Sequence, residues 1–485
     1  MCTTSERILG NSGSNTLAAR HLFSHADTRA LETAASAQLP PHALMERAGL
    51  AIARFAMAVA PHAQRIWIPA GPGNNGGDGL EAAHHLKHWG KEVIVTQLAA
   101  PNGAPSDAMA ARQKAAQTNV TFSDHMPEQY DLCIDALFGI GQKRSFDPRC
   151  TTLIQQINSK VAPVLAVDVP TGLDAETGST NGLYVRAHST LTLLTLKPGL
   201  FTGDGRDACG DVWFNSLDVP EPTTACAQLN SRLHRTTRAH NTHKGSYGDV
   251  GVVGGCKGMS GAALLAATAA LRGGAGRVYL TLLDPDHPHF YAAQPELMFR
   301  SLADLPYQSM TVVAGCGGGM VIHEHLESIM TLADRLVLDA DALNAIASSP
   351  ELQHTLRQRM NKPTVLTPHP LEAARLMGIS SAEVQANRLG VAKEMAKRFS
   401  CTVVLKGSGT VITTPNQLPR INTTGNARLA TAGTGDVLAG LIGAHLAAGS
   451  DAFQAASEAV FRHGHTADAW NTDTTMTAHD LAQAL

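Results

Sequence analysis

The sequence lacks the features of several protein classes. Its net charge is only -3, from 38 basic and 41 acidic residues, so no strong overall field favours nucleic acid or an anionic membrane as a partner. No apolar run reaches the roughly 18 residues that a bilayer-spanning helix needs. The 8 cysteines form no CxxC pair, which predicts reduced thiols in a cytoplasmic protein instead of disulfides or a zinc ribbon.

Two catalytic motifs are also missing. No GxxxxGK[ST] string occurs, which excludes a Walker-type nucleotide site, and no GxSxG string suggests a serine hydrolase. The segment up to about Ala19 is rich in Ser, Thr and Asn and has no basic head followed by an apolar stretch. It does not resemble a secretory signal, and we expect a flexible leader there.

The elements that the sequence predicts alternate between strands and helices from about residue 44 onward, which is typical of α/β folds with parallel sheets. The stretch Asp218–Thr242 is rich in Pro, Thr and Arg and has no clear periodicity, so it predicts a joint between two domains, placed at 20–220 and 230–485. The predicted strands are 65–69, 92–98, 131–137, 163–168, 276–283, 311–314, 335–338, 364–366 and 402–413. The predicted helices are 44–60, 79–89, 321–332, 371–377, 381–399, 434–447 and 451–468.

The most informative local feature of the first half is the loop GPGNNGGDG, from Gly71 to Gly79, between a predicted strand and a helix. Glycines let backbone N–H groups approach a ligand, and the start of the next helix favours an anion such as a nucleotide phosphate. An ordinary tight turn needs fewer glycines. The loop also matches GxGxxG, but the acidic residue expected about 20 positions on is replaced by Thr96, Gln97 and Leu98, which argues against ordinary NAD binding.

Two further predicted strands end in aspartate, at Asp135 and Asp168. Open α/β sheets bind ligands at the carboxyl ends of their strands, although either aspartate alone could simply cap a turn. Asn75, Asp135 and Thr171 offer oxygen atoms and could converge on a hard cation. Lys143 and Arg144, which follow Asp135, are available for a phosphate.

The segments LMERAG, GPGNNGGDG, DALFGIG and VDVPTGLD, in this order, resemble the NAD(P)H-hydrate epimerase domain over about residues 20–220. The resemblance implies a Rossmann-like three-layer fold that interconverts the R and S forms of a hydrated nicotinamide ring. It implies Asp168 as the substrate-contacting, proton-transferring carboxyl group, and K⁺ ligands at Asn75, Asp135 and Thr171, where the family often has Ser in the last place. The substrate-binding residues that it implies are Asn74, Asn75, Gly76, Gly77, Asp78, Gly139, Ile140, Gly141, Gln142, Lys143, Arg144, Ser145 and Asp168.

The second half contains AGTGD at the start of a strongly helical stretch, so Gly433, Thr434 and Gly435 would present N–H groups as an anion hole. Asp436 could take the proton of a hydroxyl group that attacks a phosphoryl group, although an acidic residue at a helix start is also a common cap. KGSGT, Lys406–Thr410, is a second glycine-rich bend beside a cation, or only a hairpin.

Together AGTGD and KGSGT resemble the ribokinase-like superfamily, and HKGSYGDVGVVGG, LDADALN, LTPHPLEAARL and NTTGN are similar to its ADP- or ATP-dependent NAD(P)H-hydrate dehydratase branch. The resemblance covers about residues 230–485 and implies Mg²⁺ as cofactor and an adenine nucleotide, for which we expect ADP. The usual GPGLG loop of the family is GCGGG here, Gly315–Gly319. Implied nucleotide-binding residues are Lys406, Gly407, Ser408, Gly409, Thr410 and Gly435; implied substrate-binding residues are Ala262, Gly317, His369 and Asp436.

The combined prediction is a bifunctional enzyme, a homo-oligomer, that epimerises hydrated NADH or NADPH and dehydrates the S form with ADP, giving AMP and phosphate. The alternative is a ribokinase-like kinase of a vitamin or hydroxymethyl-pyrimidine with a non-catalytic N-terminal binding module. His369 and the NTTGN segment argue against it. The paired histidines His84/His88 and His463/His465 have no HExxH partner, so we expect them on solvated helix faces.

Overall fold

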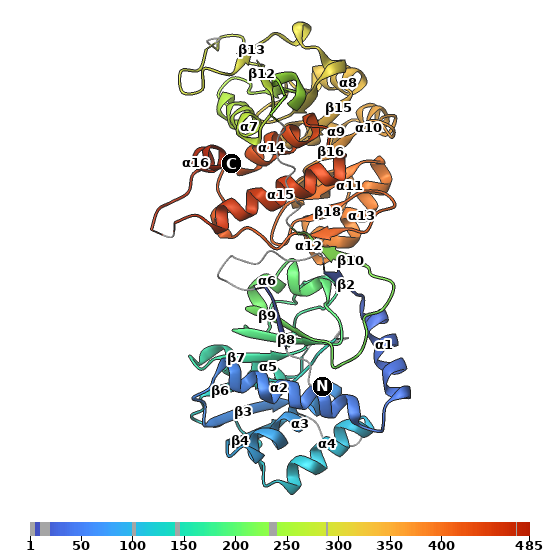
Figure 1. Cartoon of the computed structure of the whole chain (residues 1–485), viewed down its shortest axis with the longest axis vertical. Helices are drawn as coiled ribbons and strands as arrows, with labels where there is room; N and C mark the ends of the chain where they lie inside the picture. Colours follow the sequence, from blue (N-terminus) through green and yellow to red (C-terminus); the bar gives the residue numbers. More distant parts are fainter. Residues whose placement is uncertain are drawn as a thin grey trace. The chain divides into compact units, whose positions relative to one another are not determined.

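The structure is a computed structural model that describes residues 5–9, 20–98, 103–140, 146–231, 240–287, 290–471 and 473–485 (Figure 1). The described residues fall into two compact units, which divide between Ala227 and Gln228. The division lies inside the stretch predicted as a joint. Each unit is an α/β fold with a mainly parallel sheet, as the sequence predicts.

The sheet of the first unit has the order β1-β9-β8-β7-β6-β3-β4-β5, and its pairs are parallel except β1 with β9. The chain runs outward from β3 in both directions, so the space after β3 and β6 is a topological switch point, where such sheets bind ligands. The strands of this sheet are β1 (Glu6–Leu9), β3 (Arg65–Ala70), β4 (Glu92–Gln97), β5 (Thr121–Phe122), β6 (Leu132–Asp135), β7 (Val164–Val167), β8 (Ser189–Leu193) and β9 (Asp211–Asn215). The two-residue strand β2 (His21–Leu22) lies in the first unit but is not part of this sheet.

Helices cover both faces of this sheet because its strands alternate their side chains between two cores. Ile66 and Ile68 of β3 pack with α2, α3 and α4, whereas Trp67 between them packs with α5. The helices are α1 (His25–Gln38), α2 (Ala43–Val59), α3 (Asn74–His88), α4 (Ser106–Gln117), α5 (Pro148–Ser159) and α6 (Gly205–Ala208).

The sheet of the second unit runs β13-β12-β11-β14-β15-β16-β17-β18-β19-β10, with parallel pairs from β13 to β17 and antiparallel pairs on either side of β18. Its strands are β10 (Ala227–Leu229), β11 (Asp249–Gly254), β12 (Arg277–Leu282), β13 (Met298–Phe299), β14 (Thr311–Ala314), β15 (Arg335–Leu338), β16 (Thr364–Leu366), β17 (Thr402–Leu405), β18 (Val411–Thr413) and β19 (Arg420–Ile421). The carboxyl ends of β15, β16 and β17 therefore lie side by side.

Two cores again sandwich this sheet. Val312 and Leu336 pack with α8 to α13, and Val313 and Val337 pack with α7, α14 and α15. The helices are α7 (Ser260–Gly273), α8 (His323–Leu332), α9 (Ala340–Ser348), α10 (Pro350–Arg357), α11 (Pro370–Met377), α12 (Ser381–Ala386), α13 (Arg388–Phe399), α14 (Thr434–Ala447), α15 (Ala452–Asp468) and α16 (Ala478–Ala484). Both units thus have the predicted three-layer arrangement.

Several predicted boundaries were wrong. The first helix after the glycine loop begins at Asn74, not at residue 79, because Gly73 in an extended conformation already serves as its N-cap. Within 402–413, the strands β17 and β18 flank the KGSGT bend, as the sequence predicts. The expected flexible leader contains β1, which pairs with β9; the rest of the leader includes residues outside the described part.

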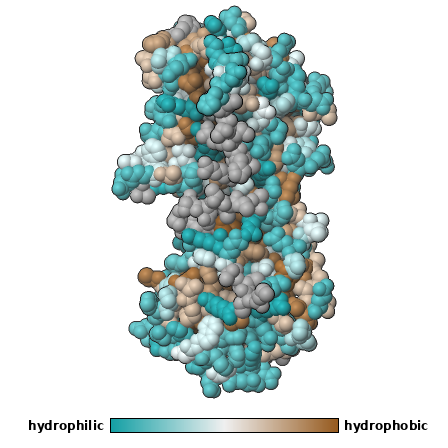
Figure 2. Space-filling model, in the orientation of Figure 1, coloured by the Kyte–Doolittle hydropathy of each residue, from teal (hydrophilic) through white to brown (hydrophobic). Residues whose placement is uncertain are grey.

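Among the described residues, no helix is long and apolar enough to cross a membrane. On the face seen in Figure 2, hydrophilic side chains cover most of the described surface, and hydrophobic ones are scattered between them. Seven cysteines lie in the described part of the chain, and all are free thiols.

Candidate functional site

The first unit holds a cavity of about 320 Å³ at the switch point beside β3 and β6. The loops after both strands line it, together with α1, α2, the end of β7 and the segment after β8. Among the residues predicted from the sequence, it brings together Asn74, Asn75, Asp78, Gly139, Ile140 and Asp168. The predicted residues Gly141, Gln142, Lys143, Arg144 and Ser145 lie outside the described residues.

Asp168 follows β7 and has a positive φ of 63°, a conformation that costs a non-glycine residue energy and often marks a functional position. Its Oδ1 atom accepts hydrogen bonds from the N–H of Leu193 at 3.1 Å and the hydroxyl of Thr192 at 3.2 Å. The same atom forms an ion pair with the ammonium group of Lys197, which is only 1% exposed. These partners fix the carboxylate at the cavity wall.

The start of α3 carries the predicted loop residues. A Cβ atom on Gly76 would lie 2.0 Å from the carbonyl oxygen of Gly71, so only glycine lets the helix begin this close to the preceding loop. Gly77 is buried next to Met45. The amide of Asn74 donates to Glu32 Oε1 at 3.0 Å. Gly76 and Gly77 therefore shape the helix start, whereas Asn74 reaches the cavity.

Two of the three predicted cation ligands, Asp135 at the end of β6 and Thr171 after β7, are in direct contact. Asp135 is fully buried; its Oδ1 lies 2.7 Å from the hydroxyl of Thr171, and its Oδ2 accepts from the Thr171 N–H at 2.9 Å. The Thr171 hydroxyl is 3.3 Å from the carbonyl oxygen of Phe138. A Cβ atom on Gly139 would lie 3.0 Å from the amide oxygen of Asn75, so that oxygen faces the same loop.

The chemistry of these donors fits K⁺. All are oxygen atoms, which suit a hard cation. Burial raises the pKa of Asp135 to about 6, although the hydrogen bonds from Thr171 and Leu137 counteract it. A bound cation would offset the cost of ionising Asp135 in this buried place.

In the second unit, the predicted nucleotide residues meet around Lys406 at the end of β17. Its ammonium group lies 2.7 Å from Asp339 Oδ1, and Asp339 also accepts a hydrogen bond from Thr367 at 2.7 Å. A Cβ atom on Gly435 would lie 3.3 Å from the ammonium nitrogen. The cation therefore stands at the start of α14, where free N–H groups favour an anion.

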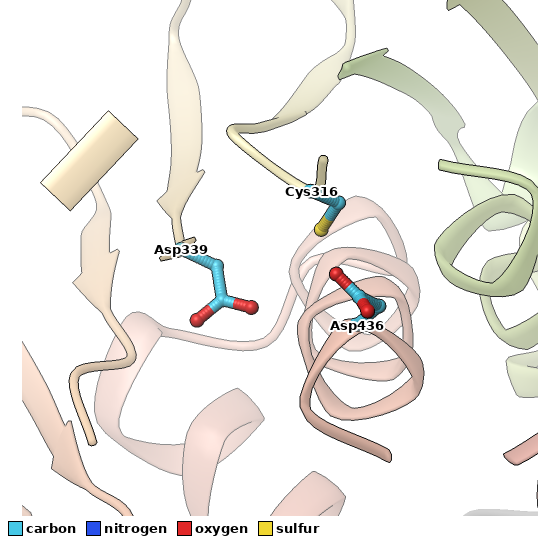
Figure 3. A group of neighbouring side chains, drawn as sticks. All are labelled: Cys316, Asp339 and Asp436. Carbon is cyan, nitrogen blue, oxygen red and sulfur yellow. The ribbon is translucent and has the colours of Figure 1, made fainter. Parts of the chain in front are cut away.

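Asp436 lies in the first turn of α14 and faces Cys316 and Asp339 (Figure 3). One ligand atom from each of these three side chains lies within 4.8 Å of the others. Burial, followed by the negative charge of Asp339, raises the pKa of Asp436 to about 7, and a hydrogen bond with Cys316 counteracts the rise. A group of this pKa can both accept and release a proton near neutrality.

The remaining nucleotide candidates, Gly407, Ser408, Gly409 and Thr410, form the bend between β17 and β18. Gly407 has a φ of 131°, and a Cβ atom there would lie 2.9 Å from the guanidinium of Arg388. Arg388 is buried and donates to the carbonyl oxygens of Leu405 and Lys406. The bend is thus a hairpin that Arg388 holds through these hydrogen bonds, and position 407 requires glycine.

The predicted substrate residues of this unit lie at helix starts and on a loop: Ala262 in the first turn of α7, Asp436 in the first turn of α14, His369 at the N-cap of α11 and Gly317 after β14. His369 caps α11, where its Nδ1 accepts from the N–H groups of Leu371 and Glu372. The preceding residue, Pro368, accepts the N–H of Lys406 at 2.9 Å. Ala262 and Gly317 contact each other, since a Cβ atom on Gly317 would lie 3.0 Å from the Cβ of Ala262.

Four residues in or beside these sites escaped the sequence reasoning. His463, expected on a solvated face, is buried, and its Nε2 lies 2.9 Å from the carbonyl oxygen of Thr434 in the anion-hole segment. Burial lowers its pKa to about 4. Lys197, Asp339 and Cys316 are the others. Asp339 stands in the quoted LDADALN motif, whereas Lys197 and Cys316 gave no local signal for their contacts.

Both units match families of known proteins. Residues 250–485 match the family described as NAD(P)H-hydrate dehydratase, and residues 41–199 match the one described as YjeF-related protein N-terminus. The bifunctional NAD(P)H-hydrate repair enzyme Nnr of Escherichia coli (strain K12) is 36% identical over 444 residues, which cover 88% of this chain and 84% of that protein. The chain belongs to the family of bifunctional NAD(P)H-hydrate repair enzymes.

Other relatives carry the same description. The Nnr enzyme of Thermofilum pendens is 32% identical and covers 88% of this chain and 87% of its own length. A solved ADP/ATP-dependent NAD(P)H-hydrate dehydratase from Bacillus subtilis, co-crystallised with ATP and Mg²⁺, is 32% identical, with a TM-score of 0.44, and covers 51% of this chain and 91% of its own.

The family membership confirms the prediction of a bifunctional NAD(P)H-hydrate repair enzyme whose second half is a NAD(P)H-hydrate dehydratase domain. It does not favour the alternative, a vitamin kinase with a non-catalytic first module. The roles of individual residues remain predictions.

Proposed function

We propose that the first unit interconverts the R and S forms of hydrated NADH or NADPH, and that the second unit dehydrates the S form with ADP, giving AMP and phosphate. The observation that carries this proposal is the meeting of Lys406, Gly435 and Asp436 at the start of α14. A cation, free N–H groups and a carboxyl group of suitable pKa are what phosphoryl transfer to a hydroxyl group requires.

In the second unit, Asp436 takes the proton from the ring hydroxyl as that oxygen attacks the terminal phosphoryl group of ADP. Lys406 and the N–H groups of Gly433 and Gly435 stabilise the charge on the transferred group, whereas the N–H of Thr434, which the sequence also suggested, donates to the carbonyl oxygen of Thr431. The phosphorylated oxygen then leaves as inorganic phosphate, and loss of a proton from the ring restores the dihydronicotinamide. His369 holds the nicotinamide end of the substrate.

Mg²⁺ fits this site as a partner of the nucleotide. Asp339 Oδ1 bonds to Lys406 and Thr367, but among the described residues its Oδ2 has no hydrogen-bond partner. That oxygen lies 4.0 Å from where a Cβ atom on Gly435 would stand, so it faces the anion hole. Mg²⁺, when bound with the nucleotide, neutralises phosphate charge, and Asp339 would hold it.

In the first unit, we propose that the cavity holds the hydrated nicotinamide and that Asp168, fixed by Lys197, exchanges the proton of its hydroxyl group. Asn74, Asp78, Gly139 and Ile140 would contact the substrate. K⁺, when bound, supplies positive charge beside the substrate, and Asn75, Asp135 and Thr171 would hold it. The cytoplasmic location and a homo-oligomeric assembly stay predictions.

One experiment tests both activities in the full chain. A mixture of R and S hydrated NADH is incubated with ADP, Mg²⁺ and K⁺, and the near-ultraviolet absorbance of the regenerated dihydronicotinamide is followed. We expect complete conversion of both forms by the wild type. If conversion stops when the S form is consumed, the epimerase proposal is contradicted. If no dihydronicotinamide forms even when ADP is present, the dehydratase proposal is contradicted.

The K⁺ proposal has its own arm. Exchange of K⁺ for a large organic cation should slow consumption of the R form and leave consumption of the S form unchanged. Thr171→Val, which removes one oxygen ligand while keeping the side-chain shape, should weaken the response to K⁺. An unchanged K⁺ response in this variant would contradict the ligand assignment.

A further inference from the structure

The carboxyl groups of the epimerase cavity differ in their surroundings. Four line it: those of Glu32, Asp78, Asp107 and Asp168. Several carboxyl groups in one cavity can act as acid and as base at the same pH only if their environments differ. One environment must favour the neutral acid and another the charged carboxylate. Their polar partners show which group is set apart.

Three of the four have partners that favour the charged form. Glu32 accepts from Asn74 at 3.0 Å and lies 3.5 Å from the guanidinium of Arg29. Asp107 lies 2.7 Å from His42 Nδ1. Asp168 is ion-paired with Lys197, as described above. Each of these three carboxyl groups therefore has a hydrogen-bond donor or a basic side chain beside it.

Asp78 differs from all three. Its carboxyl group has no hydrogen bond or ion pair with any residue in the described part of the chain, although it faces the cavity from the first turns of α3. Burial raises the pKa of Asp78 well above its usual value, and the negative charges of Asp168, Glu32, Asp107 and Glu81 raise it further. The surroundings of Asp78 thus favour the neutral acid, which can donate a proton.

We propose that Asp78 is a second catalytic residue of the epimerase, acting as the acid that complements the carboxylate of Asp168. The inference rests on the proposed epimerase function and deepens it, because the sequence assigned Asp78 only to substrate binding. Two carboxyl groups of opposite protonation state in one cavity can serve both faces of a ring carbon.

In the proposed step, the proton of Asp78 passes to the hydroxyl group on the ring carbon, and the C–O bond breaks. The hydroxyl group leaves as water, and the lone pair of the neighbouring ring nitrogen forms a C=N bond to the same carbon. Asp168 takes a proton from a second water molecule, whose oxygen bonds to the same carbon from the opposite face. The C=N electrons return to nitrogen. One proton has moved from Asp78 to Asp168, and exchange with solvent restores the starting state.

The reverse direction uses the same groups with their roles exchanged. Protonated Asp168 then acts as the acid and ionised Asp78 as the base, as microscopic reversibility requires. The mechanism also predicts that each inversion replaces the hydroxyl oxygen on the ring carbon by an oxygen atom from solvent water. A role of Asp78 in substrate binding alone predicts neither result.

The test compares wild type with Asp78→Asn, which keeps the size and hydrogen-bonding ability of the side chain but cannot donate an acidic proton. Each protein receives the pure R form without ADP, and chromatography follows appearance of the S form against an enzyme-free blank. We expect kcat for epimerisation to fall on the order of 100-fold or more with little change in KM. Asp78→Glu, which keeps the carboxyl group, should recover part of the rate.

Two controls separate the possible failures. ADP-dependent dehydration of the pure S form by the same variant reports folding of the chain and should be unchanged. If the wild type itself does not epimerise the substrate, the proposed function fails. If the wild type does and Asp78→Asn keeps its kcat or changes only KM, the role of Asp78 alone is overturned.

Two wild-type measurements decide the question even if the variant does not fold. In H₂¹⁸O, each R-to-S conversion should incorporate one ¹⁸O atom into the product, and inversion without incorporation would overturn the step. The dependence of kcat/KM on pH should fall on both sides of an optimum, because one carboxyl group must be protonated and the other ionised. A profile with a single limb would overturn the two-carboxyl assignment.

Discussion

Replacing Asp436 by Asn should lower dehydratase activity and raise the stability of the fold. We expect the carboxyl group to serve catalysis, but its ionisation in this buried place costs free energy. Its pKa is about 7, whereas the ordinary value is 3.8. The folded state therefore holds the proton more tightly than the unfolded chain. The stabilisation is fully present below about pH 4 and is lost as the pH rises through about 7.

The size of the effect follows from the shift. A rise from 3.8 to about 7 is about three units, and at ~1.4 kcal/mol per unit ionisation lowers the free energy of unfolding by up to ~4 kcal/mol. Partial exposure of the side chain to solvent reduces this to about 2–4 kcal/mol. The asparagine variant carries no such charge, so at about pH 8 it should be more stable than the wild type by this amount. At about pH 5 the gain should be less than half as large.

The stability arm is urea unfolding of the full chain, with hydrogen exchange of peptides from α14 as the probe of the second unit. The activity arm is ADP-dependent dehydration of the S form, for which loss of a general base predicts a fall in kcat of about 10²–10⁴-fold. Asp334→Asn is the matched control, because Asp334 is an exposed carboxylate of the same unit and its removal changes the net charge equally. Epimerisation by the first unit is the internal control.

Either arm can refute the reasoning. Dehydration that survives the substitution would show that Asp436 is not the base. A gain in stability that is the same at both pH values, or no larger than that of Asp334→Asn, would show that ionisation of Asp436 does not destabilise the fold. Loss of activity together with loss of stability would point to a structural role instead.

Three further substitutions test contacts seen in the structure. Lys197→Met removes the cation that is ion-paired with Asp168, and should lower the free energy of unfolding of the first unit by ~3–5 kcal/mol. The variant should also epimerise more slowly, whereas dehydration of the S form should be unchanged. A stable, active variant would contradict the role of this ion pair. Lys406→Met should reduce ADP-dependent dehydration by about 10²–10³-fold and spare epimerisation, measured with the pure R and S forms. His463→Phe removes the hydrogen bond to Thr434 and should raise the KM for ADP about tenfold. The pH profile of dehydration between about 6 and 9 should stay the same, because a pKa of about 4 keeps His463 neutral in that range. A changed profile would contradict the neutral state of His463.

The sequence by itself determined the fold class, the order of the two units and several of the residues that line the cavity of the first unit. Glycine-rich turns after strands and aspartates at strand ends carry this information locally, because the backbone conformation of a turn and the polarity of a strand end depend on neighbouring residues. For that reason Asp135, Asp168, Lys406 and Asp436 could be singled out from short segments.

Only the tertiary structure decided which side chains meet and which polar groups have no partner. Lys197 reaches Asp168 across 29 positions, and Lys406 reaches Asp339 across 67, so no local pattern could pair them. Burial is likewise a property of the packed fold: the same kind of side chain is partnered at Asp168 and unpartnered among the described residues at Asp78. The electrostatic environment that separates their roles exists only once the strands and helices have come together.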